Sequence, residues 1–171
     1  TWTLTGSERM RNRPIAILVD ALKSLGANIE YLEKDGCPPM KIQGGKLKGG
    51  KITIDGSVSS QYLSALIMIA PSLTGGLEME LTGKIASIPY LKMTLALIAE
   101  FGAKYTFEGS IIKIEEGKYQ GKEFTVEADW SAASYWYQIA ALSDEANITL
   151  KGLKEVSLQG DSAIVEMYKT F

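Results

Sequence analysis

Histidine is absent from this chain of 171 residues, and cysteine occurs once, at Cys37. Without histidine, the chain cannot form a Ser-His-Asp or Cys-His catalytic group of its own. A single cysteine excludes an internal disulfide and a cysteine-rich zinc site. We therefore predict that Cys37 is a small buried or loop residue and that the chain holds no metal.

Excess positive charge is also missing, because 18 lysines and arginines face 20 aspartates and glutamates. A mildly acidic chain is a poor candidate for a nucleic-acid binder, which neutralises backbone phosphates with lysine and arginine. No apolar run approaches the roughly 20 residues that cross a bilayer, and the N-terminus has no signal-peptide pattern. A local basic cluster still suits a small anion.

Two stretches of the chain resemble each other at a spacing of 76 residues, measured between Gly26 and Gly102. Each has an apolar helical pattern that begins at a proline, Pro14 or Pro89, ends at the glycine and continues as a strand. The sequence therefore predicts an internal repeat.

The similarity extends beyond these helices, since each copy has a second apolar helix, which begins at Ser59 or Ser131 and ends near Ala70 or Leu142. The predicted strands form two matching sets, 52–55 and 77–81 in the first copy and 124–127 and 147–150 in the second, with short extra strands near 41–42 and 111–114.

A third copy begins near Val165, where the sequence parallels that from Val19, and the chain stops at Phe171 before any glycine cap. We therefore expect about two repeated units plus the start of a third, in a chain that begins at Thr1 and was cut from a longer one.

Three arginines, Arg9, Arg11 and Arg13, precede Pro14, which fits the first turn of a helix. The positive end of a helix dipole disfavours cations, so the cluster makes sense if an anion lies beside it. The alternative is a solvated basic turn.

Three further segments lie at predicted helix starts. Ser59, Ser60 and Gln61 follow a predicted strand, and their hydroxyls, amide and helix-opening N–H groups are neutral donors suited to a phosphate. Ser87 precedes one helix and Asp129 another. At all three places, helix capping alone is the alternative.

In their order along the chain, these segments resemble the EPSP synthase family of enolpyruvyl transferases. The resemblance rests on four motifs, which are Glu8-Arg9-Met10 with Arg13-Pro14, Asp55-Gly56-Ser57-Val58-Ser59-Ser60-Gln61, Ser87-Ile88-Pro89-Tyr90, and Glu127-Ala128-Asp129 with Ser131 and Ser134-Tyr135. The match runs across essentially the whole chain, and the serine-rich motif is its most specific part.

The resemblance implies an α+β fold of repeated βαβαββ units with mixed sheets, three units to each of two lobes. Residues 1–127 would belong to the lobe that grips shikimate-3-phosphate, and residues 128–171 would start the second lobe, truncated. Substrates bind between the lobes. By this resemblance, the residues that bind shikimate-3-phosphate are Ser59, Ser60, Gln61, Ser87 and Tyr90. Those that bind phosphoenolpyruvate are Arg13 and Gln61, and Asp129 is a further candidate for the site.

The family transfers the enolpyruvyl group of phosphoenolpyruvate to the 5-hydroxyl of shikimate-3-phosphate and releases phosphate, in the shikimate pathway of aromatic amino-acid biosynthesis. It needs neither a metal nor an organic cofactor, and a cytoplasmic protein, monomeric at full length, is implied. The family's acid and base residues have no counterpart here, so we expect the chain alone to be inactive. Ala86 replaces an expected valine, and Trp130 replaces a small residue.

Two alternatives stay open at this point. The first is a UDP-N-acetylglucosamine enolpyruvyl transferase, although Cys37 does not match the loop that carries its reactive cysteine, and the serine grip suits a small phosphate better. The second is a non-enzymatic anion-binding module of the same repeat fold. The length of the native gene would separate the enzyme from the module.

Overall fold

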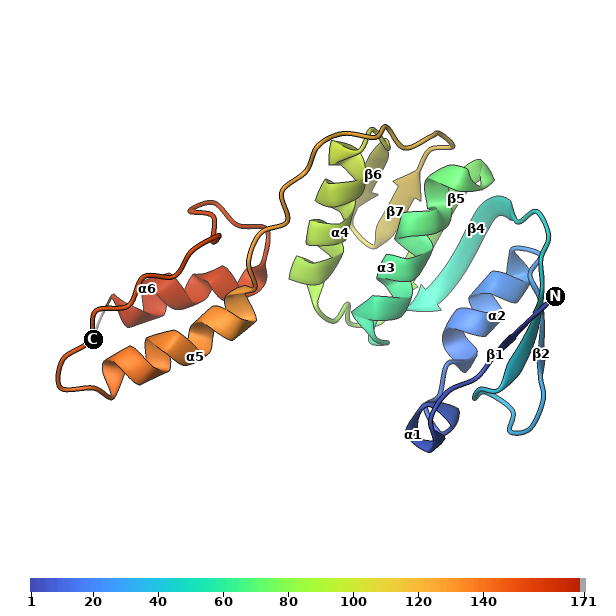
Figure 1. Ribbon diagram of the computed structural model, residues 1–171. Helices are drawn as coiled ribbons and strands as arrows, with labels where there is room; N and C mark the ends of the chain where they lie inside the picture. The colour runs from blue at the N-terminus through green and yellow to red at the C-terminus, as the bar shows by residue number, and fades with distance from the viewer. Residues whose placement is uncertain (170–171) are drawn as a thin grey trace.

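The predicted repeat is confirmed by two helices that end in the same way. A computed structural model describes residues 1–169, and Figure 1 shows their arrangement. Helices α2 (Ala16–Ser24) and α4 (Ile88–Glu100) are each followed by a left-handed glycine. The next residue donates its N–H to the carbonyl five residues earlier, at 2.9 Å for Ala27 and 3.0 Å for Ala103. These bonds satisfy carbonyls that the end of a helix leaves unpaired.

A four-stranded mixed sheet forms the centre of the molecule. Its strands, in the order β4-β5-β7-β6, are β4 (Lys48–Asp55), β5 (Thr74–Thr82), β7 (Ile111–Ile114) and β6 (Tyr105–Glu108). Strands β4 and β5 pair in parallel, whereas the β5–β7 and β6–β7 pairs are antiparallel. The strands predicted in the first copy and the short strand predicted at 111–114 are thereby confirmed.

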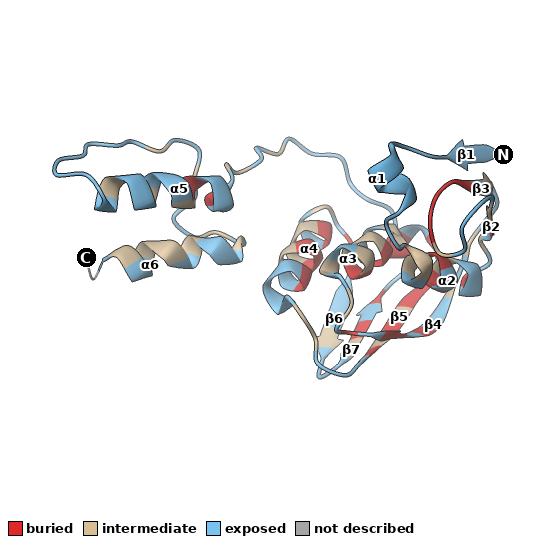
Figure 2. Cartoon of the chain, turned by 90° about the horizontal axis from the view of Figure 1, so that it is seen from below, coloured by how far each residue is buried: buried red, intermediate tan, exposed pale blue. Residues whose placement is uncertain are grey.

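Helices α3 (Ser60–Ile69) and α4 cross over one face of this sheet, with the turn η1 (Ala70–Ser72) after α3. Figure 2 shows them on the same side as α2, with buried residues between helices and sheet. The order β4-α3-β5-α4-β6-β7 is one βαβαββ unit, as the resemblance predicted.

The core lies between these helices and the sheet. Ile52 and Ile54 alternate with exposed residues on β4, so their side chains point to one face. Leu63, Leu66 and Ile67 are buried at helical spacing on α3. Full burial of such a side chain is worth about 1.5–3 kcal/mol, so this layer holds α3 against the sheet.

Gly76 lies at a close approach of backbones in the sheet. Its φ is 70°, and a Cβ built there would lie 2.2 Å from the Ile114 carbonyl oxygen. A real side chain does not fit at that distance, and the left-handed backbone would also be strained. Gly76 therefore permits β5 and β7 to lie side by side.

A smaller antiparallel sheet precedes β4. It has the order β1-β3-β2, from β1 (Trp2–Leu4), β3 (Met40–Gln43) and β2 (Asn28–Tyr31). Val19 of α2 packs with Ile29 and Met40 in a second cluster of buried residues. The strand predicted after Gly26 and the short strand predicted near 41–42 are confirmed, and Cys37 is buried, in line with one of its two predicted settings.

Two short elements at the N-terminus were not predicted. Strand β1 has three residues, too few for a periodic pattern. Helix α1 (Glu8–Arg11) is a single turn capped by Ser7, in the arginine-rich segment for which no helix was predicted. The prediction that Pro14 lies in the first turn of a helix is wrong, because α2 begins at Ala16 with Ile15 as its N-cap.

The C-terminal part contains α5 (Trp130–Ala141), the turn η2 (Gly160–Ala163) and α6 (Ile164–Tyr168). Helix α5 confirms the predicted helix 131–142, and α6 lies where the third copy was expected, although residues 170–171 lie outside the described residues. The strands predicted at 124–127 and 147–150 are wrong. Neither segment pairs with a strand within residues 1–169, and Val126 is 81% exposed.

In residues 1–169 we find no helix with the length and apolar character to cross a membrane.

A candidate anion-binding site at two helix starts

The serine-rich turn follows β4 and opens α3. Asp55 Oδ1 accepts a 2.8 Å hydrogen bond from Ser57 N, and hydrogen bonds from the Ser57 backbone and hydroxyl lower the pKa of this carboxyl. Ser59 is the N-cap, and its Oγ accepts from Gln61 N at 3.3 Å. The predicted capping role of Ser59 is therefore present. The Ser60 hydroxyl makes no hydrogen bond within the described chain, which leaves it available to a ligand.

Ser87 opens α4 in a conformation that is rare for a residue with a side chain. Its φ and ψ are 55° and 42°, and it is the one non-glycine residue with positive φ in the part of the chain that the structure describes. Such a backbone costs on the order of 1–3 kcal/mol and is concentrated at functional sites. Ser87 occupies the N-cap position, but its hydroxyl makes no capping hydrogen bond. The hydroxyl thus remains free at an exposed helix start.

Backbone hydrogen bonds join these two loops. Gly56 N donates to Thr82 O at 2.7 Å, and Ala86 N donates to Gly56 O at 2.8 Å. Both loops follow the carboxyl ends of the parallel strands β4 and β5, and Figure 1 shows α3 and α4 starting at the same end of the sheet. The unpaired N–H groups and positive dipole ends of two helices therefore face one region, which favours an anion there.

Arg13 and Gln61 line one cavity of about 170 Å³, although 48 residues separate them in sequence. The cavity forms because Tyr62 of α3 donates its hydroxyl to the carbonyl of Pro14 at 2.6 Å. Arg13 is exposed, and its guanidinium has no hydrogen bond or ion pair with any described residue. A free guanidinium beside a free amide suits a carboxylate or a phosphate.

The three arginines of the basic cluster differ in their partners. Arg11 Nη2 forms an ion pair with Glu33 Oε2, and the hydrogen bond to Glu33 raises the pKa of Arg11. Within residues 1–169, neither Arg9 nor Arg13 has a side-chain partner. Arg13 is the one that lines the cavity with Gln61. The cluster is therefore divided between an ion pair and a free cation.

The remaining two predicted residues are in different situations. Tyr90 lies in the first turn of α4, two residues after Ile88, and its side chain is 48% exposed. Asp129 is the N-cap of α5, where its Oδ1 accepts from Ser131 N at 2.8 Å. No hydrogen bond or ion pair within the described residues joins Asp129 to the serine loops. The structure links the two serine loops through Gly56 and Ala86 and places Arg13 and Gln61 at one cavity, but it leaves Asp129 in a capping role.

Sequence reasoning did not identify the network around Glu127. Desolvation opposes ionisation of this carboxylate, but hydrogen bonds from Lys154 N, Ser157 Oγ and Trp130 Nε1 outweigh it and lower the pKa of Glu127. Gln159 accepts from Trp130 N at 2.9 Å and donates to Ala128 O at 2.8 Å. Apart from the Trp130 indole, three residues from Glu127, the partners lie 27 to 31 positions apart, a spacing that no local pattern predicts. The network fastens residues 127–130 to residues 154–159.

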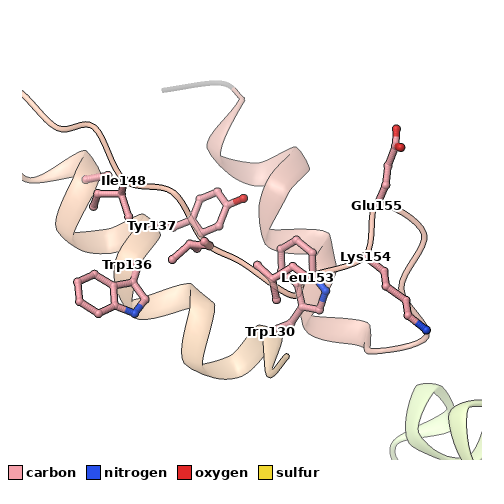
Figure 3. A pocket seen from close by; sticks show the side chains of 9 residues that line it. Trp130, Trp136, Tyr137, Ile148, Leu153, Lys154 and Glu155 are labelled. Carbon is pink, nitrogen blue, oxygen red and sulfur yellow. The ribbon is translucent and has the colours of Figure 1, made fainter. Parts of the chain in front are cut away.

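An aromatic cavity of about 410 Å³ lies between α5 and the segment that follows it. Figure 3 shows Trp130, Trp136, Tyr137 and Leu153 around it, whereas the charged ends of Lys154 and Glu155 point away from Trp136. None of the serines or arginines discussed above lines this cavity. Most of the residues that line it are apolar or aromatic, a lining less suited to a phosphate than the serine loops.

Comparison with known proteins identifies close relatives. The family model for EPSP synthase (3-phosphoshikimate 1-carboxyvinyltransferase) matches residues 1–171. A protein of Bacteroides fragilis strain YCH46 named 3-phosphoshikimate 1-carboxyvinyltransferase is 55% identical over 168 residues. A protein of the same name from Actinobacillus pleuropneumoniae serotype 5b is 42% identical over 161 residues.

These alignments cover 97% and 92% of this chain but 41% and 37% of the two relatives. The chain thus spans about two fifths of the length of the curated relatives that it matches. Among solved structures, EPSP synthase from Acinetobacter baumannii superposes with a TM-score of 0.76 at 23% identity, over 98% of this chain and 37% of that one. At this identity the superposition speaks for the fold alone. Since the family match covers every residue and the α3–α4 unit has the family's βαβαββ order, the chain belongs to the EPSP synthase family.

Proposed function

We propose that this chain is part of an enzyme that transfers the enolpyruvyl group of phosphoenolpyruvate to the 5-hydroxyl of shikimate-3-phosphate. The hydroxyl oxygen adds to the central carbon of phosphoenolpyruvate, and the tetrahedral intermediate then loses inorganic phosphate. The shared names of the relatives support this reaction, and the site described above supports the part that this chain plays in it.

In this proposal the two helix starts bind the phosphate of shikimate-3-phosphate. The free hydroxyls of Ser60 and Ser87 and the first N–H groups of α3 and α4 supply neutral donors, with Ser59 beside them. Neutral donors held by the backbone need no reorganisation when the ligand arrives. Tyr90 lies in the first turn of α4, where it would border the ring of the same substrate.

Arg13 and Gln61 would bind phosphoenolpyruvate, with Gln61 contacting both substrates because it also opens α3. The Tyr62–Pro14 hydrogen bond holds the Arg13 segment against that helix start. A guanidinium that lacks a protein partner gains most from an anionic ligand, since no existing ion pair must be broken. The single observation that carries the proposal is this meeting of Arg13 and Gln61 beside the linked serine loops.

The other expectations from the sequence are part of the same proposal. Residues 1–127 would serve the lobe that grips shikimate-3-phosphate, and residues 128–171 would begin the second lobe. Asp129 would approach substrate only if ligand binding moves it from its cap. A cytoplasmic location, a monomeric full-length protein and a reaction without metal or organic cofactor rest on the resemblance.

The test is a titration of the 15N-labelled chain with shikimate-3-phosphate, followed by NMR. We expect weak binding, about millimolar in Kd because only part of the site is present. Shifts should appear at the amides of Ser59, Ser60, Gln61 and Ser87. Subsequent addition of phosphoenolpyruvate should shift Gln61 again, together with the Arg13 side chain.

UDP-N-acetylglucosamine is the matched control, because it would be the substrate of the alternative enolpyruvyl transferase. We expect no shifts at the serine loops with this compound. Shifts that gather around the Gly49–Gly50 loop, or tighter binding of UDP-N-acetylglucosamine, would overturn the proposal. Inorganic phosphate alone should reproduce the serine shifts but not those of Tyr90.

A further inference from the structure

Helices α3 and α4 are joined by a polar contact between their side chains. Ser64 Oγ and Thr94 Oγ1 lie 2.9 Å apart, and Thr94 Oγ1 also donates to the carbonyl of Tyr90 at 3.0 Å. A threonine hydroxyl has one hydrogen, which is used in the bond to Tyr90, so Ser64 is the donor to Thr94. A continuous hydrogen-bonded chain therefore runs from α3 through Thr94 to the backbone of Tyr90.

The surroundings of this contact are apolar. Thr94 is 9% exposed. Among the described residues it is the one polar side chain that is buried. Leu63, next to Ser64, and Leu91 and Leu95, near Thr94 in sequence, are almost fully buried. Two apolar side chains of similar shape would fill the same space at little cost in stability. Packing alone therefore does not account for a hydroxyl pair at this position.

The pair lies close to the proposed phosphate site. Ser64 follows Ser60 by four residues, and Thr94 follows Tyr90 by the same four residues. Four residues correspond to about one helical turn, or about 6 Å along each axis. The contact thus joins the two helices about one turn after the start of α3 and less than two turns after the start of α4.

We propose that Ser64 and Thr94 are a positioning pair, which sets the spacing between the two helix starts that bind the phosphate of shikimate-3-phosphate. This inference rests on the proposed function of the serine loops. A hydrogen bond keeps a narrow range of distance and angle, whereas apolar side chains can slide past one another. The pair holds α3 and α4 in one relative position, and the Thr94–Tyr90 bond transmits that position to the first turn of α4.

The test compares Ser64→Ala, Thr94→Val and the double variant with the conservative variants Ser64→Thr and Thr94→Ser. Binding of shikimate-3-phosphate to each 15N-labelled chain is measured by NMR, and thermal unfolding is measured on the same samples. Loss of one hydrogen bond is worth about fivefold in affinity, at about 1 kcal/mol. We expect each disruptive single variant to weaken binding by about that factor.

The double variant should bind no more weakly than the weaker single variant, because both substitutions remove the same contact. The conservative variants should bind within about twofold of the original chain, since a hydroxyl is kept. Unchanged affinity in Ser64→Ala and Thr94→Val, with only a lower unfolding temperature, would assign the pair a purely structural role and overturn the inference.

A second measurement separates this inference from the proposed function. Hydrogen exchange of the Ala86 amide, measured without ligand, reports the bond between the two loops. If the original chain binds no shikimate-3-phosphate, the proposed function fails. The exchange rate of the Ala86 amide then tests the positioning role by itself. Faster exchange at Ala86 in the disruptive variants would then uphold the positioning role, and unchanged exchange would reject it.

Discussion

Ala86 donates its backbone N–H to the carbonyl of Gly56, 30 positions earlier, at 2.8 Å. This bond ties the loop before α4 to the loop before α3. Loops that are distant in sequence are therefore held together, and under the proposed function substitutions in either loop should affect the same ligand.

Ser87 provides a test in which stability and binding change in opposite directions. Ser87→Gly should raise the unfolding temperature by about 2–4 °C, because relief of a left-handed backbone is worth about 1 kcal/mol. It should also weaken shikimate-3-phosphate binding, since the free hydroxyl is lost. Ser87→Ala is the control, which loses the hydroxyl but keeps the strain. Equal unfolding temperatures for the two variants would show that the backbone at residue 87 is not strained.

Ser59 serves as a cap and as a proposed ligand, and two substitutions separate these roles. Ser59→Ala should cost about 1 kcal/mol of stability, the usual value of an N-cap, and should weaken phosphate binding. Ser59→Asp keeps a capping oxygen but places a negative charge beside the phosphate. We therefore expect near-original unfolding by calorimetry and loss of binding by NMR. A Ser59→Asp chain that binds phosphate normally would place the site elsewhere.

Arg13→Ala, introduced into the complete enzyme, should impair use of phosphoenolpyruvate far more than use of shikimate-3-phosphate. Loss of one charged contact to a buried partner costs about 2–5 kcal/mol, or roughly 30-fold or more in kcat/KM. Arg11→Ala is the matched control, because Arg11 is already paired with Glu33. Steady-state kinetics with each substrate varied in turn measure the effect. Similar kinetics for both variants would show that Arg13 belongs to a solvated basic turn and does not bind phosphoenolpyruvate.

Glu127 should make the unfolding free energy depend on pH in the acidic range. Its pKa is lowered from the ordinary value of 4.5 in the folded chain, so its contribution to stability is present above pH 4.5. That contribution is lost as the pH falls below 4.5 and through the folded-state pKa. Glu127→Gln should therefore be less stable than the original at pH 7, and the difference should shrink in acid.

The exposed Glu123, four residues earlier, supplies the control Glu123→Gln. Urea unfolding monitored by tryptophan fluorescence suits this comparison, since Trp130 donates its indole N–H to Glu127 at 2.8 Å. A constant difference between Glu127→Gln and the original chain across pH 3–7 would contradict the assigned network.

The chain of 171 residues should show no measurable enolpyruvyl transfer by itself. It spans 41% of its Bacteroides fragilis relative, and groups that act together around a transition state lose most of their effect when several are missing. Phosphate release from both substrates at millimolar concentrations is the assay. Turnover near that of a full-length enzyme would mean that the acid and base groups lie within these residues.

Much of the central unit could be predicted because its signals are local. The apolar residues of α3 recur at helical spacing, and Ile52 and Ile54 alternate on β4. Gly26 and Gly102 mark the ends of equivalent helices, so the repeat itself was visible. The strands at 124–127 and 147–150 failed for a physical reason. A strand needs a neighbour for its hydrogen bonds, and an apolar pattern cannot show whether the neighbour is present.

The candidate site was only partly accessible to the same reasoning. Helix starts and capping residues are local features, which is why Ser59, Ser87 and Asp129 were found. The cavity shared by Arg13 and Gln61 depends on the Tyr62–Pro14 bond, across 48 residues, and no periodicity encodes such a contact. The ion pair that distinguishes Arg11 from Arg13 was not predicted for the same reason, because Glu33 lies 22 positions from Arg11.

Gly76 has a consequence for any saturation mutagenesis of this protein. A Cβ at this position would lie 2.2 Å from the Ile114 carbonyl oxygen, so every other amino acid should be rejected there. The position should therefore appear as intolerant in a growth-based screen as Ser60, which is proposed to bind substrate. Abundance measured in parallel should separate the two, because Gly76 variants would lose folded protein, whereas Ser60 variants would accumulate normally but fail to support growth.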